Sequence, residues 1–565
     1  MTYILGLSAF YHDSAATLIK GGKVIAAAEE ERFSRIKHDN SFPINAINYC
    51  LSEANIDINK IKYIAYYEKP LVKFDRVVHM FLNTYPFSFI TFWKSFPAMV
   101  TEKLNIKSII RKKLKFNGKI LFIPHHESHA ASAFFPSPFS KAAIFTVDGV
   151  GEWQTTGLYL GIGNHIIPLK IINFPNSLGL LYSTITAFLG FKVNEDEYKV
   201  MGLSAYGKPI YYKKFLKLVK INEDGSFTLN MEYFSFIESF KMWSKKMEKL
   251  FGKPRKPMEK IKKRHANIAS SLQKITEEIY LKVLNHLYKL TKVKNLCIAG
   301  GVALNALANG KIYEETPFRK VFIQGAAGDN GASLGAAFFV YNFLLKQKRN
   351  FVQNHLYFGP SFSNDYIEKF LKEIKADYEY LNDKELVKRI AELLSRNNVV
   401  GWFRGRMEFG PRALGARSIL ANPKPKWMKD RVNEIKRRES FRPFAGSFLQ
   451  EYVHEYFEVP EENHYSPFMI FAFKVKKEKA KYIRAIVHAN NTCRIQTVNR
   501  RDNGIYYDLI KEFYKITKIP GILNTSFNLK GEPIVCKPEE AYYDFIKTSM
   551  DFLVLNNYIV YKLCP

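Results

Sequence analysis

Two histidines spaced by four residues are the first feature of this sequence that could do chemistry. His125 and His129 follow the apolar run 119–123, which predicts a strand, and Pro124, whose fixed φ suits a first helical turn. Residues four apart lie on one face of a helix. Such a pair of imidazoles could bind Zn²⁺ or Fe²⁺ but is unsuited to Ca²⁺. The alternative is a polar helix start with solvated histidines.

Two acidic residues that follow later strands could complete a metal site. Asp148 ends the predicted strand 142–147 and precedes Gly149, and Asp329 lies in a glycine-rich turn after the predicted strand 321–324. Glycine lets the backbone approach a phosphate or a metal closely. An ordinary Asp-Gly turn is the alternative at each position. The sequence therefore predicts four ligands for one ion: His125, His129, Asp148 and Asp329.

A second glycine pair predicts a nucleotide site. Gly300 and Gly301 lie between the predicted strand 294–299 and the residues leading to Asn305. At a strand-to-helix junction, glycines present backbone N–H groups and a positive helix end to phosphate. We expect Gly149, Gly300, Gly301 and Asn305 to hold the nucleotide beside Asp148.

The start of the chain favours a particular fold. A strand over 3–9 precedes a hairpin whose turn is Gly21-Gly22. Together with the later glycine-rich strand ends, this suggests the ribonuclease-H-like lobes of actin-type ATPases. In that fold His12 and Lys37 lie where the first strands deliver them to a cleft. Each could equally be a loop residue or a surface charge.

Length and composition indicate a folded protein of more than one domain. The chain has 565 residues, more than one hydrophobic core accommodates. Its hydrophobic content is 47% and its charged content 24%, as in folded globular proteins. A linker at 351–355 and a change of composition after it predict domains over 1–350 and 356–565.

The formal charge of +31 favours anionic partners such as nucleotides, phosphates, nucleic acid or a membrane surface. The Lys and Arg residues are scattered along the chain, so we do not expect nucleic acid as a partner. Five cysteines without CxxC spacing, and a start without a leader, predict reduced thiols in a cytoplasmic protein. The aromatic stretch 81–100 is interrupted by Lys94 and two prolines. It predicts a buried or partner-facing helix pair, with no membrane as partner.

The order of motifs resembles the NodU/TobZ carbamoyltransferase family over nearly the whole chain. The motifs that carry this resemblance are His125-His-Glu-Ser-His129, Asp148-Gly149, Gly300-Gly-Val302, Gly405-Arg-Met-Glu-Phe-Gly-Pro-Arg412, Arg442-Pro-Phe-Ala445, Arg494-Ile-Gln-Thr497 and Asn524-Thr-Ser-Phe-Asn528. The resemblance implies an α/β fold. Its N-terminal domain would be of the actin/ribonuclease-H-like (ASKHA) type, similar to threonylcarbamoyl transferases, and its C-terminal domain YrdC-like.

The resemblance also implies a reaction. Carbamoyl phosphate is hydrolysed, the carbamate is captured by ATP as carbamoyl-adenylate, and the carbamoyl group passes to a hydroxyl of a small acceptor such as a sugar or secondary metabolite. The family implies Fe(II); the ligand types also allow Zn²⁺, and Mg²⁺ is a further candidate. We expect His12 to be the base for the acceptor, which requires a near-neutral pKa. Lys37 would bind the carbamoyl-adenylate.

The second half carries residues suited to a phosphate dianion. The guanidinium fork of arginine matches phosphate bidentately, whereas a surface ion pair is the alternative for any single arginine. Arg417 is one such residue in the motif region. Asn524, in a polar turn expected after a strand over 520–523, could bind the carbamoyl amide. The carbamoyl phosphate site is therefore expected to comprise Arg412, Lys436, Arg442, Arg494 and Asn524.

Two other functions remain open at this level. A tRNA threonylcarbamoyl-type enzyme would fit the positive charge, and it predicts strongly salt-dependent tRNA binding. A nucleotide-binding regulator on an actin-like scaffold would bind ATP without carbamoyl phosphate-dependent AMP release. The variable region 210–263 is expected to shape acceptor binding, but neither the acceptor nor an oligomeric state follows from the residues.

Overall fold

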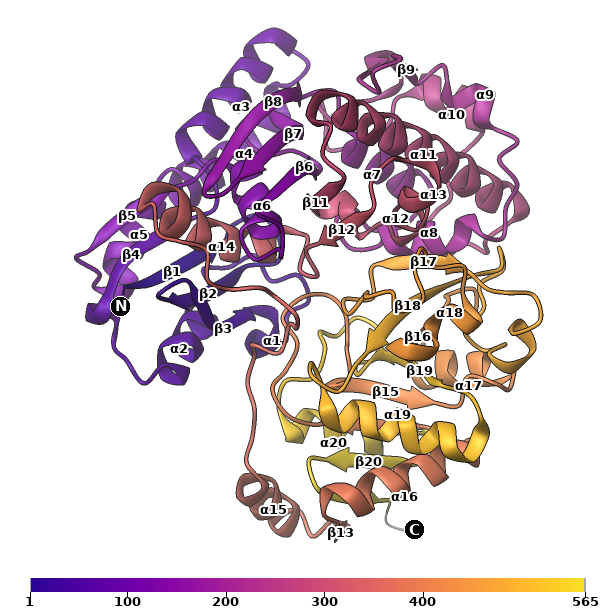
Figure 1. Ribbon diagram of the computed structural model, residues 1–565. Coiled ribbons are helices and arrows are strands. Elements are labelled where there is room, and N and C mark those ends of the chain that lie inside the picture. Colours follow the sequence, from indigo (N-terminus) through magenta and orange to yellow (C-terminus); the bar gives the residue numbers. More distant parts are fainter. Residues whose placement is uncertain (1, 563–565) are drawn as a thin grey trace. The chain divides into compact units, whose positions relative to one another are not determined.

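The computed structural model describes residues 2–562, and the chain divides into two compact units (Figure 1). Unit 1 comprises the chain up to Glu30 together with His38–Gln353. Unit 2 comprises the short segment Glu31–Lys37 and the chain from Asn354 onward. Within residues 2–562, no helix is both long and apolar enough to span a bilayer.

Unit 1 is built on two five-stranded sheets with the same topology. The strand orders are β3-β2-β1-β4-β5 and β8-β7-β6-β11-β12. In each sheet the first three strands form an antiparallel meander, and the last two run parallel to the first strand. The strands are β1 (Tyr3–Ser8), β2 (Ala15–Lys20), β3 (Lys23–Glu29), β4 (Ile61–Tyr66), β5 (Lys119–Phe122), β6 (Lys141–Val147), β7 (Gln154–Ile162), β8 (His165–Asn173), β11 (Asn295–Ala299) and β12 (Lys320–Ile323). This duplication is the arrangement expected of actin-type lobes, and the predicted α/β class is confirmed.

The predicted glycine hairpin is present between β2 and β3. Gly21 and Gly22 both have positive φ, 56° and 81°. Two left-handed residues in a row make a turn whose twist matches that of the flanking strands, and glycine adopts this conformation without steric cost.

Two helices in equivalent positions of the two lobes meet in the middle of unit 1. Helix α6 (His125–Phe134) follows β5, and α14 (Asp329–Phe338) follows β12. A Cβ on Gly335 would lie 1.8 Å from the carbonyl oxygen of Ser128, and one on Gly6 would lie 1.9 Å from that of Ser333. Such contacts exist only because these residues lack a side chain. The small residues therefore let α14 lie directly on α6 and on β1.

The remaining helices of unit 1 cover the sheets and form the insertions. They are α2 (Ile44–Glu53), α3 (Pro70–Thr84), α4 (Phe89–Ala98), α5 (Ile106–Leu114), α7 (Leu178–Phe188), α8 (Glu197–Ser204), α9 (Tyr212–Phe215), α10 (Lys245–Phe251), α11 (Lys263–Thr291), α12 (Ala306–Gly310) and α13 (Ile312–Glu315). A small ribbon of β9 (Val219–Ile221) and β10 (Phe227–Leu229) lies in the variable region 210–263. The helix pair expected around 81–100 corresponds to α3 and α4.

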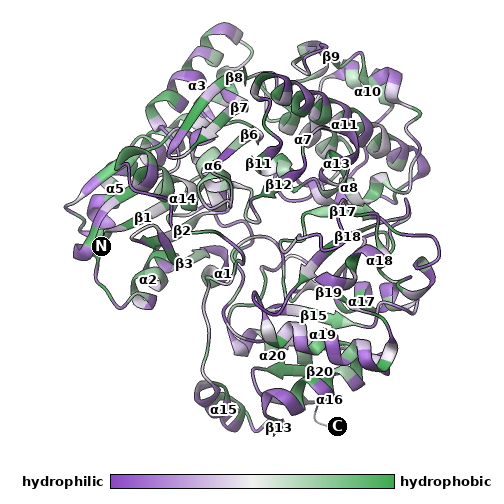
Figure 2. Ribbon diagram, viewed as in Figure 1, coloured by the Kyte–Doolittle hydropathy of each residue, from purple (hydrophilic) through white to green (hydrophobic). Residues whose placement is uncertain are grey.

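Unit 2 contains a nine-stranded mixed sheet in the order β13-β21-β20-β14-β15-β19-β16-β18-β17. Figure 2 shows β20 as hydrophobic along its length, and Trp402 on the neighbouring β14 is fully buried. The strands are β13 (Asp377–Tyr380), β14 (Val400–Phe403), β15 (Arg417–Ala421), β16 (Ala445–Leu449), β17 (Phe471–Lys474), β18 (Thr492–Val498), β19 (Gly521–Ser526), β20 (Phe552–Leu555) and β21 (Tyr558–Tyr561). The helices are α1 (Glu31–Ser34), α15 (Asn364–Glu373), α16 (Asp383–Ser395), α17 (Met428–Ile435), α18 (Val453–Tyr456), α19 (Gly504–Thr517) and α20 (Pro538–Ile546).

The cysteines within the described residues are free and buried: Cys50, Cys297, Cys493 and Cys536. This agrees with the expectation of reduced thiols. The fifth, Cys564, lies outside the described residues.

Candidate metal and anion sites

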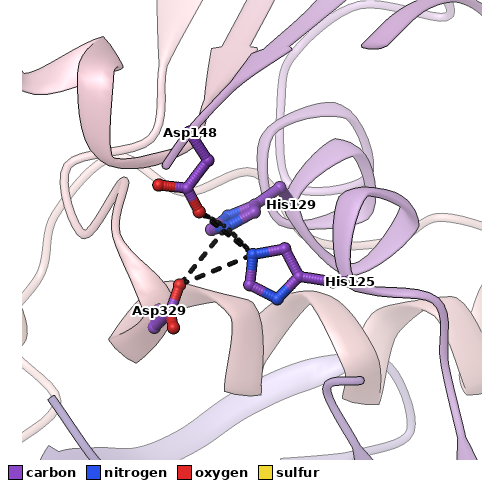
Figure 3. A group of neighbouring side chains, drawn as sticks. All are labelled: His125, His129, Asp148 and Asp329. Atoms are coloured by element: carbon purple, nitrogen blue, oxygen red, sulfur yellow. Dashed lines mark hydrogen bonds and ion pairs between the residues drawn. The ribbon is translucent and has the colours of Figure 1, made fainter. Parts of the chain in front are cut away.

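The two histidines of α6 point to one place, as their spacing predicts (Figure 3). Pro124 is the N-cap of α6 rather than its first helical residue, so His125 begins the helix. His125 and His129 are 2% and 0% exposed, and their Nε2 atoms lie 3.1 Å apart. Both rings are therefore withdrawn from solvent with their Nε2 atoms adjacent.

Asp148 meets both imidazoles from the end of β6. Its Oδ2 lies 3.0 Å from His125 Nε2 and 3.1 Å from His129 Nε2. Its Oδ1 accepts hydrogen bonds from the backbone N–H groups of Gly149, at 2.8 Å, and Gly301, at 3.2 Å. The two glycine loops thus orient the carboxylate so that one oxygen faces the histidines.

Asp329 is a buried carboxylate that faces imidazoles but has no close hydrogen-bond donor among residues 2–562. It is 1% exposed at the first residue of α14, and neither of its oxygens accepts a hydrogen bond from any residue between 2 and 562. Its Oδ1 lies 3.5 Å from His129 Nε2 and 3.7 Å from His125 Nε2. An ionised carboxylate without donors is costly to bury unless a cation accompanies it.

The four side chains fit a transition-metal ion. One ligand atom from each lies within 4.8 Å of all the others. Ligands bound at about 2.0–2.2 Å around one ion are spaced at about 3–3.5 Å, close to the separations found here. Two imidazoles and two carboxylates suit Fe²⁺ or Zn²⁺. The structure therefore brings together all four residues that the sequence singled out.

The pKa values of these side chains are shifted because buried imidazoles and carboxylates lie within 4.8 Å of one another. Burial lowers the pKa of His129, but its hydrogen bond to Asp148 and the nearby carboxylate of Asp329 outweigh burial and raise the pKa to about 9. Burial raises the pKa of Asp148, but hydrogen bonds with His125 and His129 bring it well below its usual range. In the apo protein a proton on an imidazole partly neutralises the two carboxylates. A bound cation would take the place of that proton.

His12 lies beside this group in a strained loop between β1 and β2. Phe10 and Asp13 have φ of 67° and 52°, a conformation that L-residues adopt rarely and that is concentrated at functional sites. His12 Nδ1 lies 3.0 Å from Asp13 Oδ2, and Nε2 lies 4.0 Å from Asp329 Oδ2. Burial lowers its pKa, but the two carboxylates outweigh burial and raise the pKa to about 9. The near-neutral pKa expected of a base is therefore absent here, because two carboxylates surround the ring.

The residues predicted to bind a nucleotide stabilise the local fold through a tight turn, a helix cap and hydrogen bonds to Asp148. Gly300 has φ of 100°, and a Cβ there would lie 2.2 Å from the carbonyl oxygen of Val147. Asn305 caps α12 by accepting from Ala308 N and exchanges hydrogen bonds with Gln273 in both directions. Gly149 and Gly301 direct their N–H groups to Asp148, so nucleotide binding by these four residues stays a prediction.

Sequence reasoning missed a basic cluster next to the metal group. Lys73 and Lys103 both lie near the Tyr11 ring, with their Nζ atoms 4.9 and 5.4 Å from its centroid. Lys73 pairs with the buried Glu68 at 2.5 Å. Burial, followed by the charge of Lys73, lowers the pKa of Lys103 to about 7. No short motif marks these residues; only their convergence on Tyr11, the neighbour of His12, reveals them.

In unit 2, three neighbouring strands place the predicted anion ligands in one row. Ala445 on β16 pairs with Arg494 on β18 and with Asn524 on β19. Paired residues project from the same face of a sheet, and the small alanine leaves the middle of the row open. Arg494 Nε and Asn524 Oδ1 are buried without a hydrogen-bond partner among residues 2–562. Two unsatisfied polar atoms on one face indicate a missing polar ligand.

The expectation that Asn524 lies in a turn after its strand is wrong. It lies inside β19, which continues to Ser526 because Leu420 and Ala445 pair with Asn524 on its two sides. Its Nδ2 donates to Ala413 O at 3.1 Å and to Ser447 Oγ at 2.9 Å. These bonds fix the amide so that Oδ1 is presented to the open row.

Other basic side chains lie near the row formed by Arg494, Ala445 and Asn524. Burial, followed by the charges of Arg412 and Arg442, brings the pKa of Arg494 well below its usual range. Lys436 lies at the end of α17, and burial together with Arg438, Arg442 and Lys37 lowers its pKa well below the ordinary value. An excess of positive charge in a buried place is what a phosphate dianion would neutralise.

Lys37 is assigned to unit 2, together with this group of basic side chains. The segment Glu31–Lys37 is part of unit 2, and the charge of Lys37 acts on Lys436. The chain leaves unit 1 after Glu30 and returns to it at His38. The expected role of Lys37 in binding the carbamoyl-adenylate stays a prediction.

Comparison with known proteins decides the family. Residues 3–338 match the family described as carbamoyltransferase N-terminus, and residues 391–562 match carbamoyltransferase C-terminus. The chain belongs to the carbamoyltransferase family. An uncharacterized protein of Synechocystis sp. is 45% identical to this carbamoyltransferase, with 100% of this chain and 97% of that protein covered. The nodulation protein NolNO of Sinorhizobium fredii is 36% identical, with 98% and 79% covered.

Solved structures are more distant from this carbamoyltransferase. The crystal structure of HypF from T. kodakarensis aligns with a TM-score of 0.33 at 12% identity, covering 61% of this chain and 48% of that one. The crystal structure of Sua5 from P. abyssi with L-threonine aligns with a TM-score of 0.25 at 15% identity, covering 32% and 48%.

Arg417 of the carbamoyltransferase is structural, although it stands in the arginine-rich motif. It is fully buried, and its guanidinium stacks on Phe403 at 3.6 Å. Its N–H groups donate to the carbonyls of Arg404, Gly405, Ala416 and Pro360. Its role is to hold the loop that precedes β15, so it does not bind an anion.

Proposed function

We propose that this carbamoyltransferase makes carbamoyl-adenylate from carbamoyl phosphate and ATP and transfers the carbamoyl group to a hydroxyl of a small molecule. Water converts carbamoyl phosphate to carbamate and phosphate. Carbamate attacks the α-phosphorus of ATP, and pyrophosphate leaves. The acceptor hydroxyl then attacks the carbamoyl carbon, releasing AMP. These three steps balance and need no further reactant.

Unit 2 carries the first step in this proposal. Arg494 and Asn524 face the same open row of the sheet, and Arg412, Arg442, Lys436 and Lys37 contribute positive charge around it. Cations aimed at the phosphate stabilise the charge that grows on it as water attacks the carbamoyl carbon and the bond from that carbon to the phosphate oxygen breaks. Asn524 Oδ1 is placed to accept a hydrogen bond from the carbamoyl amide.

Unit 1 carries the last step. His125, His129, Asp148 and Asp329 would hold Fe²⁺ or Zn²⁺, which when bound supplies Lewis-acid polarisation of the phosphate and carbamoyl oxygens. His12 lies beside these ligands and holds a proton between Asp13 and Asp329. In this proposal His12 first gives its proton to solvent; the neutral ring then takes up the acceptor hydroxyl proton as the hydroxyl attacks the carbamoyl carbon.

The observation that carries the proposal is the buried Asp329, whose oxygens find no protein donor while two imidazoles and a second carboxylate converge on it. The test supplies the purified protein with ATP, ¹³C-carbamoyl phosphate and a panel of sugars and metabolite fractions. We expect AMP and pyrophosphate release that requires carbamoyl phosphate, and a product heavier by one labelled carbamoyl group. AMP release that ignores carbamoyl phosphate would contradict the proposal.

A further inference from the structure

The helices α3 and α4 expose a concentration of large apolar side chains. Around the turn that joins them, Phe87 is 76% exposed, Trp93 68% and Ile90 66%. Water-exposed apolar side chains usually occur singly, and a contiguous group of them indicates an interaction surface. We call this group the apolar tip: Leu82, Tyr85, Phe87, Phe89, Ile90 and Trp93.

The helix pair does not need the apolar tip for its own packing. Its two helices are joined by a separate set of rings: Phe81 and Phe92 stack at 4.2 Å, Phe92 contacts Phe96 at 5.4 Å, and Phe96 contacts Phe74 at 6.4 Å. Because this internal ladder holds the pair together, the side chains of the apolar tip are available for something outside it.

The other end of the pair is anchored to unit 1. Lys73 pairs with Glu68, Asp75 accepts from Trp153 Nε1 at 3.1 Å, and the Arg76 guanidinium lies 5.1 Å from the centre of the Phe174 ring. Thr91 also donates to the carbonyl of Glu238 at 2.9 Å. The pair is therefore a fixed projection, and the apolar tip lies at the turn away from these α3 anchors.

The turn and the helix α4 that bear the apolar tip carry positive and no negative charge. Between Phe81 and Thr101 the sequence has one lysine, Lys94, and no Asp or Glu. Lys94 is exposed next to Trp93 within α4. Aromatic side chains beside lysines are typical of surfaces that enter the interface of an anionic bilayer.

We propose that the apolar tip docks this protein on the surface of a membrane rich in anionic lipids. The aromatic side chains enter the boundary between headgroups and acyl chains, and Lys94 contacts the headgroup phosphates. No helix crosses the bilayer in this arrangement. A second copy of the chain is a poorer occupant, because pairing two such surfaces would bring like charges together. The inference does not depend on the carbamoyl-transfer reaction.

The first test is sedimentation of the full-length protein with vesicles of phosphatidylcholine and phosphatidylglycerol at 3:1, and with vesicles of phosphatidylcholine alone. We expect binding to the anionic vesicles that weakens as salt is raised. The double variant Phe87→Asp/Trp93→Asp should bind about tenfold more weakly or worse, because two large apolar side chains no longer leave water. Trp427→Asp is the matched control: Trp427 is 52% exposed in unit 2, and binding should stay within twofold.

A second readout separates docking from a change in folding. Trp93 fluorescence should shift to the blue with anionic vesicles, and the shift should be lost in Trp93→Phe. The thermal midpoints of all variants should match that of the parent, because the substituted side chains lie outside the aromatic ladder. Absence of vesicle binding overturns the proposal, as does equal binding by the double variant. A concentration-dependent dimer that the double variant abolishes would instead identify a second copy as the occupant.

Discussion

At the scale of single residues, the two carboxylates of the candidate metal site differ in the hydrogen bonds that they accept. Asp148 has backbone donors on one oxygen, whereas Asp329 has no hydrogen-bond donor on either oxygen among residues 2–562. A buried carboxylate in that state raises the free energy of the apo protein, and binding of a divalent cation removes the cost. Asp329 therefore contributes to affinity for the ion together with His125, His129 and Asp148.

Replacing Asp329 by Ala should remove bound metal and stop carbamoyl transfer while leaving carbamoyl phosphate hydrolysis nearly unchanged. Elemental analysis should show metal content falling from about one ion per chain to a small fraction, and transfer should fall by about 100-fold or more. Asp430→Ala, at an exposed carboxylate of unit 2, is the control. If hydrolysis is lost together with transfer, the two steps do not use separate sites.

Replacing Arg494 by Gln should impair the other step. Loss of one charge-assisted hydrogen bond to phosphate costs about 1.5–3 kcal/mol, so kcat/KM for phosphate release from carbamoyl phosphate should fall about 10- to 100-fold. Metal content should not change. Arg484→Gln, on the surface of the same unit, should behave as the parent, and an unaltered kcat/KM in Arg494→Gln would remove this residue from the site.

Asp544 near this site should make stability depend on pH. Burial, with a contribution from Glu532, raises the pKa of Asp544 to about 7, so its contribution to stability is complete below its ordinary pKa near 4 and is lost as pH rises through 7. Asp544→Asn should therefore gain free energy of unfolding relative to the parent between pH 5 and 8, on the order of 1 kcal/mol after screening. Urea titrations at both pH values measure it; a constant difference would show that the carboxyl ionises normally.

At the scale of elements, the metal group exists because two helix starts are held side by side. His125 and Asp329 are the first residues of α6 and α14, and each helix follows the fifth strand of its lobe. The contact between the helices passes through Gly335, which lies on the backbone of Ser128. Any side chain at that position must push the helices apart and move His129 relative to Asp329.

Gly335→Ala should therefore lower both stability and metal affinity. The added Cβ would lie 1.8 Å from the Ser128 carbonyl oxygen, and overpacking of this kind costs about 1–3 kcal/mol. Thermal unfolding with and without Zn²⁺ would show a lower midpoint and a smaller stabilisation by metal. Gly504→Ala, where the nearest heavy atom is 3.9 Å away, should be neutral or slightly stabilising. Equal effects of the two substitutions would contradict the role of this contact.

At the scale of the whole molecule, the charge of +31 is divided among separate tasks. Lys436, Arg494 and their neighbours are turned inward around the anion row, and Lys73 and Lys103 surround Tyr11. These buried cations are committed to internal sites. The net charge by itself is therefore a poor guide to nucleic-acid binding.

Transfer RNA should consequently bind weakly. In filter binding at about 0.15 M salt, we expect no retention tighter than about 1 μM, the range of non-specific binding by basic proteins. An arginine-rich peptide of known affinity serves as positive control. Tight retention with a steep salt dependence would instead favour the threonylcarbamoyl-type reaction.

Short-range sequence patterns predicted several features of this protein. Helical periodicity puts His125 and His129 on one face whatever surrounds them, and a Gly-Gly pair between apolar runs turns a hairpin, because both effects act within a few residues. Only the folded chain decided the rest. It set Asn524 level with Arg494 through strand register, placed Lys37 with unit 2, and turned Arg417 inward. These outcomes depend on contacts between segments far apart along the chain, which no short stretch of residues encodes.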